Sequence, residues 1–479
     1  MNYETVIGLE VHLQLATHSK IFCSSSAAFG ADPNTHIDPL TFGLPGALPV
    51  LNKQVVNYAI MLGLALNCEI RRFNRFARKH YFYPDLPKGY QISQFDEPIC
   101  ERGSVNITVD DVERAIGITR IHMEEDAGKN IHDGRTKSSL VDLNRAGVPL
   151  LEIVSEPDLR SPAEAAAYLK TIRQVARYLQ ISDGNMDEGS LRCDANVSIR
   201  PEGEMKFGTR AEVKNINSFK FVERAISYEV ARQLSVIKGG GEVVQETRLF
   251  DSATGTTHPM RSKEESAEYR YFPDPDLPPL VVEQAWVEEI KAQMPKLPND
   301  LKKYFINELK LSDYDAGVLA AERENAEYFM KVFEVSGNAK ASCNWITTEL
   351  FGLLKKEGKD VESSPVSATS LGELISLIDN ETISGKIAKQ VFEESFYSGD
   401  EPKQIVEKQG LQQMSDEGDI RKIISTVLDN NEEQLAAFFN GKDKLKGFFV
   451  GQVMKETQGK AKPALVNELL DDELSKRKP

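Results

Sequence analysis

The 479-residue chain contains no run of 18 apolar residues, and its first residues lack the basic start and apolar core of a secretion signal. Membrane-spanning helices are therefore not expected, and the protein is predicted to be cytoplasmic. Cysteine is scarce, odd in number and without a CxxC pair, at Cys23, Cys68, Cys100, Cys193 and Cys343. This pattern is typical of free thiols in a reducing compartment rather than of a disulfide framework.

Several nucleotide and hydrolase motifs are also missing. The sequence has no GxxxxGK[ST] loop, no GxSxG elbow, no HExxH and no GxGxxG. A nucleotide enzyme with this sequence is therefore of neither the P-loop nor the Rossmann type. The net charge of −15 argues against nonspecific nucleic-acid binding by the whole surface.

Two segments depart from this acidic average. Residues 69–90 interleave six Lys/Arg with six aromatic residues, and the chain from 441 onward holds nine Lys/Arg against six Asp/Glu. Basic and aromatic residues together suit phosphate contact and base stacking. A solvated face with a few core aromatics has the same composition, so both interpretations of residues 69–90 stay open.

The length predicts two to four domains. Strand and helix patterns mix up to about residue 292, and the rest is helical in pattern. A proline-rich stretch at 293–300 and a Ser/Pro-rich stretch at 362–367 are candidate linkers. We therefore expect an α+β domain at 1–292, a helical domain at 293–362 and a helical tail at 363–479.

Alternating strands carry most of the candidate chemistry. Apolar and polar residues alternate along 5–15, 191–200 and 210–214, which predicts strands with one apolar and one charged face. The last two should pair as antiparallel neighbours. Capped helices at 161–179 and 218–238 follow in positions that suit covering the apolar face.

The charged faces hold an inventory of acids and cations. Glu10 and His12 share one strand face, Glu124 and Glu125 follow a predicted strand around 116–123, and Glu152 lies in a short apolar segment. Asp194 and Glu212 alternate with Arg192 and Lys214. Mg²⁺ prefers such hard oxygen ligands, and phosphoryl transfer needs cations beside them. Solvent-facing carboxylates and plain cross-strand salt bridges are the competing interpretations.

Six long strings together resemble the GatB family of tRNA-dependent amidotransferase subunits. They are residues 4–15 (ETVIGLEVHLQL), 81–94 (YFYPDLPKGYQISQ), 122–129 (HMEEDAGK), 141–145 (VDLNR), 188–196 (EGSLRCDAN) and 268–276 (EYRYFPDPD). The resemblance extends over essentially the whole chain.

This resemblance implies a fold and an activity. The fold is a glutamine synthetase-like cradle with a strongly curved antiparallel sheet, followed by a helical domain and a YqeY-like helical tail that holds tRNA. The activity uses ATP and Mg²⁺ to phosphorylate the side-chain carboxylate of mischarged Glu-tRNA(Gln) or Asp-tRNA(Asn). Ammonia made from glutamine by a partner amidase then displaces phosphate, and a small third protein braces the heterotrimer.

The resemblance also implies site residues. The metal ligands fall on Glu10, His12, Glu125 and Glu152. The groups around the nucleotide and acyl phosphate fall on Lys79, Tyr81, Asp85, Lys88, Arg192, Asp194, Glu212 and Lys214. Some relatives carry a four-cysteine zinc site whose positions read Cys23, Ser25, Asp38 and Thr41 here. One cysteine cannot form that site, so we predict no zinc and expect hydrophobic packing to hold residues 20–45.

Two other classes compete with this interpretation. A stand-alone ATP-dependent amide ligase or small-molecule kinase would need the same acids and lysines, but not a helical tail with a basic end. A noncatalytic RNA-binding scaffold would need only the basic-aromatic stretch, and not the charged strand faces at 192–200 and 210–214.

Overall fold

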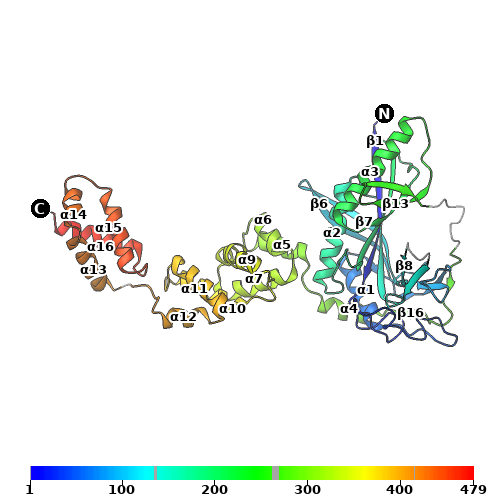
Figure 1. Ribbon diagram of the computed structural model, residues 1–479, viewed down its shortest axis with the longest axis horizontal. Coiled ribbons are helices and arrows are strands. Elements are labelled where there is room, and N and C mark those ends of the chain that lie inside the picture. Colours follow the sequence, from blue (N-terminus) through cyan, green and yellow to red (C-terminus); the bar gives the residue numbers. More distant parts are fainter. Residues whose placement is uncertain (1, 134–137, 261–268, 415, 479) are drawn as a thin grey trace. The chain divides into compact units, whose positions relative to one another are not determined.

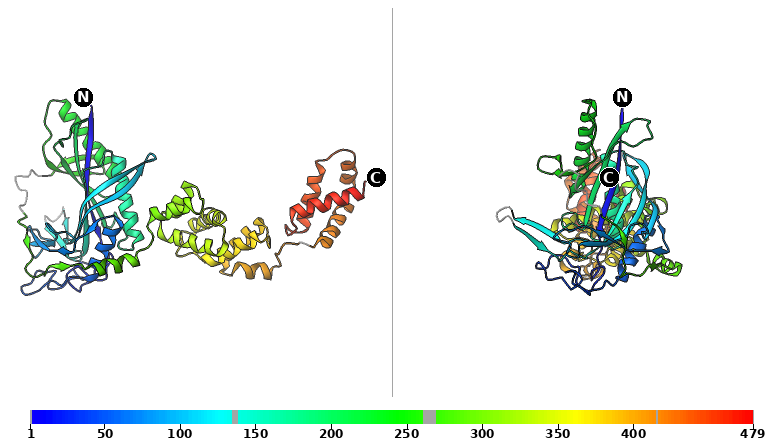
Figure 2. Two further views of the ribbon diagram at one scale, coloured as in Figure 1. Left: turned by 180° about the vertical axis from the view of Figure 1, so that it is seen from behind. Right: turned by 90° about the vertical axis from the view of Figure 1, so that its right-hand side faces the viewer.

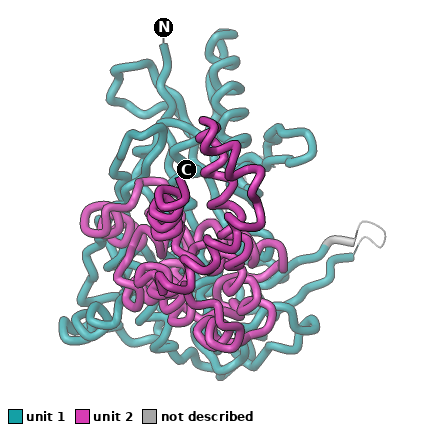
Figure 3. The backbone as a smooth tube through the Cα atoms, turned by 90° about the vertical axis from the view of Figure 1, so that its left-hand side faces the viewer, with its two compact units in different colours: residues 1–297 teal, residues 298–479 magenta. Residues whose placement is uncertain are grey.

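The computed structural model describes residues 2–133, 138–260, 269–414 and 416–478, which form two compact units. Unit 1 comprises residues 1–297 and unit 2 residues 298–479 (Figure 3). Glu268, the first residue of the EYRYFPDPD string, lies outside the described residues. No helix in the described part of the chain is both long enough and apolar enough to cross a bilayer.

A nine-stranded sheet dominates unit 1 (Figure 1). Its strands, in spatial order, are β14 (Thr256–Pro259), β13 (Glu246–Asp251), β12 (Ala211–Ile216), β11 (Leu191–Pro201), β1 (Tyr3–Gln14), β10 (Pro149–Ser155), β7 (Val112–Glu125), β6 (Cys100–Val109) and β2 (Glu69–Ile70). The predicted strands at the N-terminus and around 191–214 are present, and β11 and β12 pair antiparallel.

One pairing departs from the expected antiparallel sheet. β12 and β13 run parallel, because helix α3 (Phe219–Lys238) crosses over between them. The sheet is not a simple meander either, since β1 lies between β10 and β11, which follow it by more than a hundred residues. The sheet is therefore mixed and is assembled from distant segments.

Helices cover the apolar face of this sheet. They are α1 (Lys53–Ala65), α2 (Pro162–Tyr178) and α3, and α4 (Gln284–Gln293) packs against α1. Figure 1 shows α2 and α3 beside the long strands, and α3 contacts both β11 and β12. The α2 helix begins where the Ser161 hydroxyl accepts a hydrogen bond from the Glu164 amide, with Pro162 in the first turn.

The strand faces divide as the alternation predicts. Cys193, Ala195 and Val213 are buried in the core beneath the helices. Their neighbours Asp194 and Lys214 therefore lie on the opposite face of the sheet, because successive side chains point to opposite sides of a strand. This opposite face carries the candidate chemistry.

Small sheets adjoin the large one. The first consists of β15 (Phe272–Pro273), β4 (Ala77–His80) and β5 (Tyr90–Ser93), and a second pairs β16 (Leu280–Val281) with β3 (Phe73–Asn74). A third is the hairpin of β8 (Lys129–Asp133) and β9 (Ser138–Asp142), which projects from unit 1 in Figures 2 and 3.

Unit 2 is helical throughout its described regular elements. They are α5 (Pro298–Asn307), α6 (Asp313–Leu319), α7 (Arg323–Ser336), α8 (Ala339–Asn344), the π-helix η2 (Trp345–Leu350), α9 (Phe351–Glu357), α10 (Ala368–Asp379), α11 (Gly385–Ser398), α12 (Pro402–Lys408), α13 (Glu417–Asp429), α14 (Glu432–Phe439), α15 (Leu445–Glu456) and α16 (Pro463–Lys476).

The packing within unit 2 bears on the expected domain limits. Unit 1 ends at 297, close to the expected limit at 292. The expected limit at 362–363 instead falls between packed elements, because α10 contacts α7 and the Tyr328 hydroxyl donates a 2.9 Å hydrogen bond to the Val366 carbonyl. Helices α13–α16 enclose a core of their own, which includes Ile424, Phe449 and Leu470.

Candidate active site

One histidine and two glutamates meet on the charged face of the large sheet. His12, Glu124 and Glu152 come from β1, β7 and β10, and each offers a ligand atom within 4.8 Å of the others. His12 lies directly opposite Glu152 in the strand register, and their Nε2 and Oε2 atoms are 3.3 Å apart. Both glutamates are buried. We call these three residues the metal-ligand cluster because their donor atoms converge on one point.

His122 extends this cluster. Its Nε2 lies 3.6 Å from Glu152 and 3.7 Å from Glu124, and its Nδ1 is 3.4 Å from the Arg120 Nε that donates to it. Burial alone would raise the pKa of Glu152, but His122 and His12 hold that pKa well below its usual range. Burial would lower the pKa of His12, and the hydrogen bond and charge of Glu152 outweigh it and raise that pKa.

A second group of acids lies beside the first. Lys214 Nζ contacts Asp194 Oδ2 at 2.6 Å and Glu212 Oε1 at 3.0 Å, and the Asn196 amide donates a 2.9 Å hydrogen bond to Glu10. Burial, and then the charges of Glu152 and Glu212, raise the pKa of Glu10. The carboxylates thus crowd one another, and a bound cation would relieve their repulsion.

The small β15–β4–β5 sheet turns one face toward the metal-ligand cluster. The Ser93 hydroxyl donates a 3.1 Å hydrogen bond to Glu124 Oε2. Lys79 lies on the same face, and its Nζ is 5.0 Å from the centre of the Tyr269 ring. Burial would lower the pKa of Lys79, but Glu124 and Tyr271 raise it, so Lys79 remains a cation beside the acids.

Arg192 is held at the edge of the cluster by a buried acid. Its Nη2 atom lies 2.7 Å from Asp126 Oδ2, which also accepts a 2.7 Å hydrogen bond from the Gln14 amide. Burial would raise the pKa of Asp126, but Arg192 and Arg145 lower it. Since Arg192 faces His12 in the strand register, Asp126 orients a cation toward the cluster.

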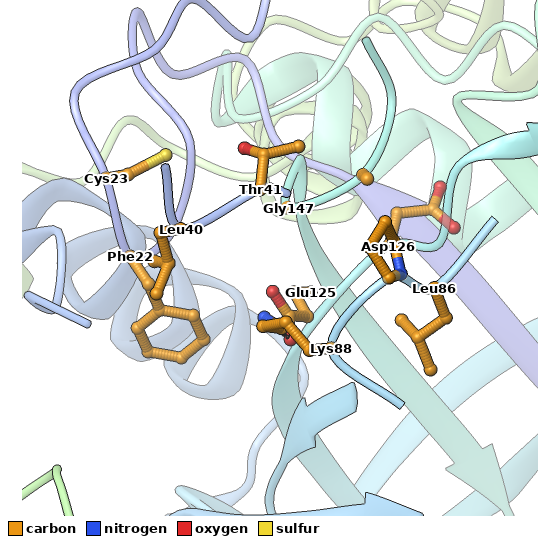
Figure 4. A pocket seen from close by; sticks show the side chains of 11 residues that line it. Phe22, Cys23, Leu40, Thr41, Leu86, Lys88, Glu125, Asp126 and Gly147 are labelled. Atoms are coloured by element: carbon orange, nitrogen blue, oxygen red, sulfur yellow. Dashed lines mark hydrogen bonds and ion pairs between the residues drawn. The ribbon is translucent and has the colours of Figure 1, made fainter. Parts of the chain in front are cut away.

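Glu125 makes different contacts from Glu124. Its Oε1 lies 2.5 Å from Lys88 Nζ and accepts a 2.8 Å hydrogen bond from the Ile92 amide. Figure 4 shows Lys88 alongside Glu125 in a pocket that also contains Cys23. Because successive strand residues point to opposite faces, Glu125 turns away from the face that His12 occupies. The described residues thus bring Glu124 into the cluster where the resemblance implied Glu125.

Tyr81 and Asp85 lie near the same buried acid, Asp126. Burial raises the pKa of both Tyr81 and Asp85, and the nearby Arg145 partly offsets this for Asp85. The Asp85 Oδ1 atom is buried and finds no hydrogen-bond partner among the described residues.

The 20–45 loop is held by polar contacts as well as by apolar packing. The Cys23 thiol donates to Asp38, whose Oδ1 also accepts from the Thr41 amide at 2.8 Å and hydroxyl at 2.9 Å. Lys20 is completely buried, and its Nζ donates to the carbonyls of His36 at 2.7 Å and Leu143 at 3.3 Å. The expected apolar component includes Phe22, which meets Phe76 edge to face at 5.3 Å.

The arginines of the basic-aromatic segment are paired within the chain. Arg71 lies 2.7 Å from Glu101, Arg72 lies 3.0 Å from Glu283, and Arg78 lies 2.8 Å from Asp274. These ion pairs favour a solvated face for the arginines of that segment, whereas Lys79 faces the metal-ligand cluster and Lys88 is buried against Glu125.

The resemblance implied no site role for Glu124, His122, Asp126 or Tyr271, although Glu124 was among the candidate acids. Strand alternation could have linked Glu124 to His122, because they are two residues apart and share a face. No local signal marks Asp126 or Tyr271, since Asp126 reaches the site through its ion pair with Arg192 and Tyr271 lies within range of the Lys79 charge.

Comparison with known proteins covers nearly the whole chain. The profile of the GatB/GatE catalytic domain matches residues 5–288, and that of the GatB domain matches residues 327–474. Curated relatives named as the B subunit of aspartyl/glutamyl-tRNA(Asn/Gln) amidotransferase include a Persephonella marina protein, 54% identical over 98% of this chain and 99% of the relative. The Syntrophotalea carbinolica protein is 56% identical over 99% of both chains, and the Geotalea daltonii protein is 57% identical over 98% and 99%.

Proposed function

The chain belongs to the GatB family of the aspartyl/glutamyl-tRNA(Asn/Gln) amidotransferases, and on that premise we propose that it activates the side-chain carboxylate of a mischarged tRNA. The substrates are Glu-tRNA(Gln), Asp-tRNA(Asn) or both, and ATP is the phosphoryl donor. A partner amidase supplies ammonia, and a small third protein completes the cytoplasmic heterotrimer. The observation that carries this proposal is the convergence of acids and cations on one sheet face.

Mg²⁺ fits the acids of this face. His12, Glu124 and Glu152 would hold one ion, with Glu10 beside them, and hard carboxylate oxygens are the ligands that Mg²⁺ prefers. The raised pKa of Glu10 reports the crowding that a cation would offset. When bound, Mg²⁺ neutralises charge on the phosphoryl group being transferred. Glu125, which the resemblance placed among the ligands, we assign instead to holding Lys88 in position.

The cations of the site orient the reacting groups. We propose that Lys79, Arg192 and Lys214 contact the nucleotide phosphates and the acyl phosphate. Lys214 suits this task because its side chain is 37% exposed while Asp194 and Glu212 fix its position. Oriented cations stabilise charge that develops in the transition state at little cost in reorganisation. Tyr81, Asp85 and Lys88 complete the polar groups that we assign to this region.

The proposed reaction has two steps, phosphorylation of the carboxylate and then amidation. A carboxylate oxygen of the substrate attacks the γ-phosphorus of ATP, the bond to the β,γ-bridging oxygen breaks, and ADP leaves. Ammonia then attacks the carbonyl carbon of the acyl phosphate, inorganic phosphate leaves, and a proton is lost to give the amide. The first step is needed because a free carboxylate is a poor electrophile.

ATP hydrolysis by the purified heterotrimer tests this proposal. We expect Glu-tRNA(Gln) or Asp-tRNA(Asn) to stimulate hydrolysis, and ammonium chloride to replace glutamine as the nitrogen source. Hydrolysis at a rate independent of tRNA would favour a small-molecule ligase or kinase. A heterotrimer that binds tRNA but never hydrolyses ATP would favour the RNA-binding scaffold.

A further inference from the structure

A pocket lined by aromatic rings lies in unit 1 beside the small β15–β4–β5 sheet. Phe95, Tyr271 and Phe272 contribute rings to its lining, and Ala77, Asp96 and Glu97 contribute to the rest. The Phe95 and Tyr271 rings are stacked, with centres 4.1 Å apart and planes 11° apart. Phe95 and Phe272 are each 46% exposed, so flat apolar surface is left open to a ligand.

The strand register places this pocket next to the metal-ligand cluster. Ala77, which lines the pocket, lies opposite Ser93, and Ser93 donates a hydrogen bond to Glu124 of the cluster. Lys79 follows Ala77 by two residues and therefore shares its face of the small sheet. Ala77 of the pocket lining thus shares a face of the small sheet with Lys79 and Ser93, whereas Phe272, opposite Arg78, lies on the other face at the rim of the sheet.

Tyr271 extends from the aromatic pocket toward the metal-ligand cluster. Its ring lies against Phe95 in the pocket, whereas its hydroxyl is near enough to Lys79, Glu124 and Glu152 for their charges to affect its pKa, which burial raises. A molecule with a flat ring at one end and an anionic group at the other could therefore occupy the pocket and the cluster together.

The charges at the pocket indicate that the ring end of such a molecule, and not its anionic end, enters the pocket. Asp96 and Glu97 line it, and Arg75 Nε lies 3.4 Å from Glu97 Oε2, so the nearby arginine is already paired with an acid. Carboxylates repel phosphate but accept hydrogen bonds from the amino group of a nucleobase. Aromatic rings bind nucleobases by stacking, whichever base is offered.

We propose that this pocket is the nucleobase subsite of the active site and that it holds the adenine of an adenosine-bearing substrate, an assignment that rests on the proposed function. Adenosine reaches such a site from two sources. ATP carries it at the end opposite its γ-phosphate, and the 3′ end of tRNA carries it next to the esterified amino acid. In both cases the reacting anionic group lies at the cluster while the base stacks on the open face of Phe95.

Kinetics of the assembled heterotrimer test the subsite. The Phe95→Ala variant removes the exposed ring, the Phe95→Tyr variant retains it, and Phe207→Ala removes a ring that is 56% exposed on the β11–β12 connection. We expect Phe95→Ala to raise one KM about tenfold, since each base–aromatic stack contributes measurably to binding. Phe95→Tyr and Phe207→Ala should leave both KM values near those of the wild type.

The two KM values distinguish ATP from tRNA as the source of the adenosine. A raised KM for ATP, with the KM for the mischarged tRNA unchanged, identifies the base as that of the nucleotide. A raised KM for the mischarged tRNA, with the KM for ATP unchanged, identifies the base as that of the tRNA. Either result supports the subsite.

Other results overturn it. If Phe95→Ala keeps both KM values within about twofold of the wild type while amidation continues, the pocket holds no base and the proposed function stands. An equal loss in Phe207→Ala would show a general defect and would likewise remove the assignment. A wild-type heterotrimer without ATP-dependent amidation would overturn the proposed function and the subsite with it.

Discussion

His12 and Glu152 face each other across the β1–β10 pair, with Nε2 and Oε2 3.3 Å apart, and this cross-strand contact links the N-terminal strand to the acids of the site. Both residues are inside the sheet rather than on loops. Their separation is therefore fixed by strand register, which a one-residue slip would destroy because it would turn His12 to the apolar face.

The first prediction distinguishes two neighbouring glutamates. Glu124→Gln should lower tRNA amidation by at least about 100-fold and weaken activation by Mg²⁺, because it removes a ligand rather than a supporting group. Glu125→Gln should lower it less, by about 10- to 100-fold, since the amide oxygen can still accept from Ile92. Titration of amidation with Mg²⁺ measures both effects, and glutamine hydrolysis by the partner amidase serves as the control. A larger loss in Glu125→Gln would reverse our assignment.

The second prediction concerns Lys214. Lys214→Ala should lower the ATP-dependent step by about 100- to 1,000-fold, the usual effect of removing one oriented donor from a developing charge. The fold should be little affected, because the side chain is partly exposed. The matched control is Lys220→Ala, an exposed lysine at the start of α3. Single-turnover formation of ADP with saturating mischarged tRNA measures the step, and near-normal turnover would leave Lys214 with a salt-bridge role only.

A third prediction assigns tRNA binding to the α13–α16 module, residues 417–476. Truncation after Gln413 should weaken tRNA binding and leave unit 1 folded, because the module has its own core. Lys446 and Lys476 of the module and the adjoining Arg477 are engaged in ion pairs with acids. The exposed lysines Lys442, Lys444 and Lys455 are therefore the better candidates for phosphate contact.

A charge-reversal variant tests whether these three lysines bind tRNA. The triple variant K442E/K444E/K455E should weaken tRNA binding and reduce its salt dependence, because contacts with phosphates release counterions. The control K206E/K220E/K238E changes the net charge equally at exposed lysines of unit 1. Filter binding over a range of salt concentrations compares them. Equal losses in the two variants would mean that overall charge, rather than the module, governs binding.

A fourth prediction concerns the buried Lys20. Lys20→Met leaves the carbonyls of His36 and Leu143 without their donor, which should cost about 1–3 kcal/mol of local stability. Hydrogen exchange should rise across residues 21–45, and Lys206→Met, at an exposed site, should not change it. Unaltered exchange in Lys20→Met would show that the loop is held by its apolar contacts alone.

Lys20 should also make the stability of the protein depend on pH. Burial lowers the pKa of Lys20, so the folded state releases this proton before the unfolded state does. Stability should therefore rise with pH between the lowered folded pKa and the ordinary value of about 10.4, since the unfolded state binds more protons there. The increase should be absent from Lys20→Met, and a matching alkaline increase in that variant would refute its origin in Lys20.

Periodicity predicted the faces of the strands but not everything that gathers on them. The alternation of Asp194 with Cys193 indicated one buried and one charged side, and the structure has both. The expected strands and the two covering helices are also present. These features depend on neighbours in sequence, and local patterns record them well.

Other features depend on distant segments. The pairing of Arg192 with Asp126 joins residues 66 positions apart, and no spacing rule relates them. The parallel β12–β13 pair and the complete burial of Lys20 are likewise set by tertiary packing. The presence of Glu124 rather than Glu125 in the metal-ligand cluster is different. Strand periodicity alone predicts that these adjacent side chains point to opposite faces of the sheet.

The central place of β1 has a consequence for synthesis. This strand is made before its two neighbours, β10 and β11, which end at residues 155 and 201. At about 5–20 residues per second, at least one edge of β1 stays unpaired for roughly 10–40 seconds before β11 is complete. During that interval Glu10 and His12 interrupt an apolar strand that would otherwise be prone to pair with other chains. The residues we assign to the metal thus also protect the strand during translation.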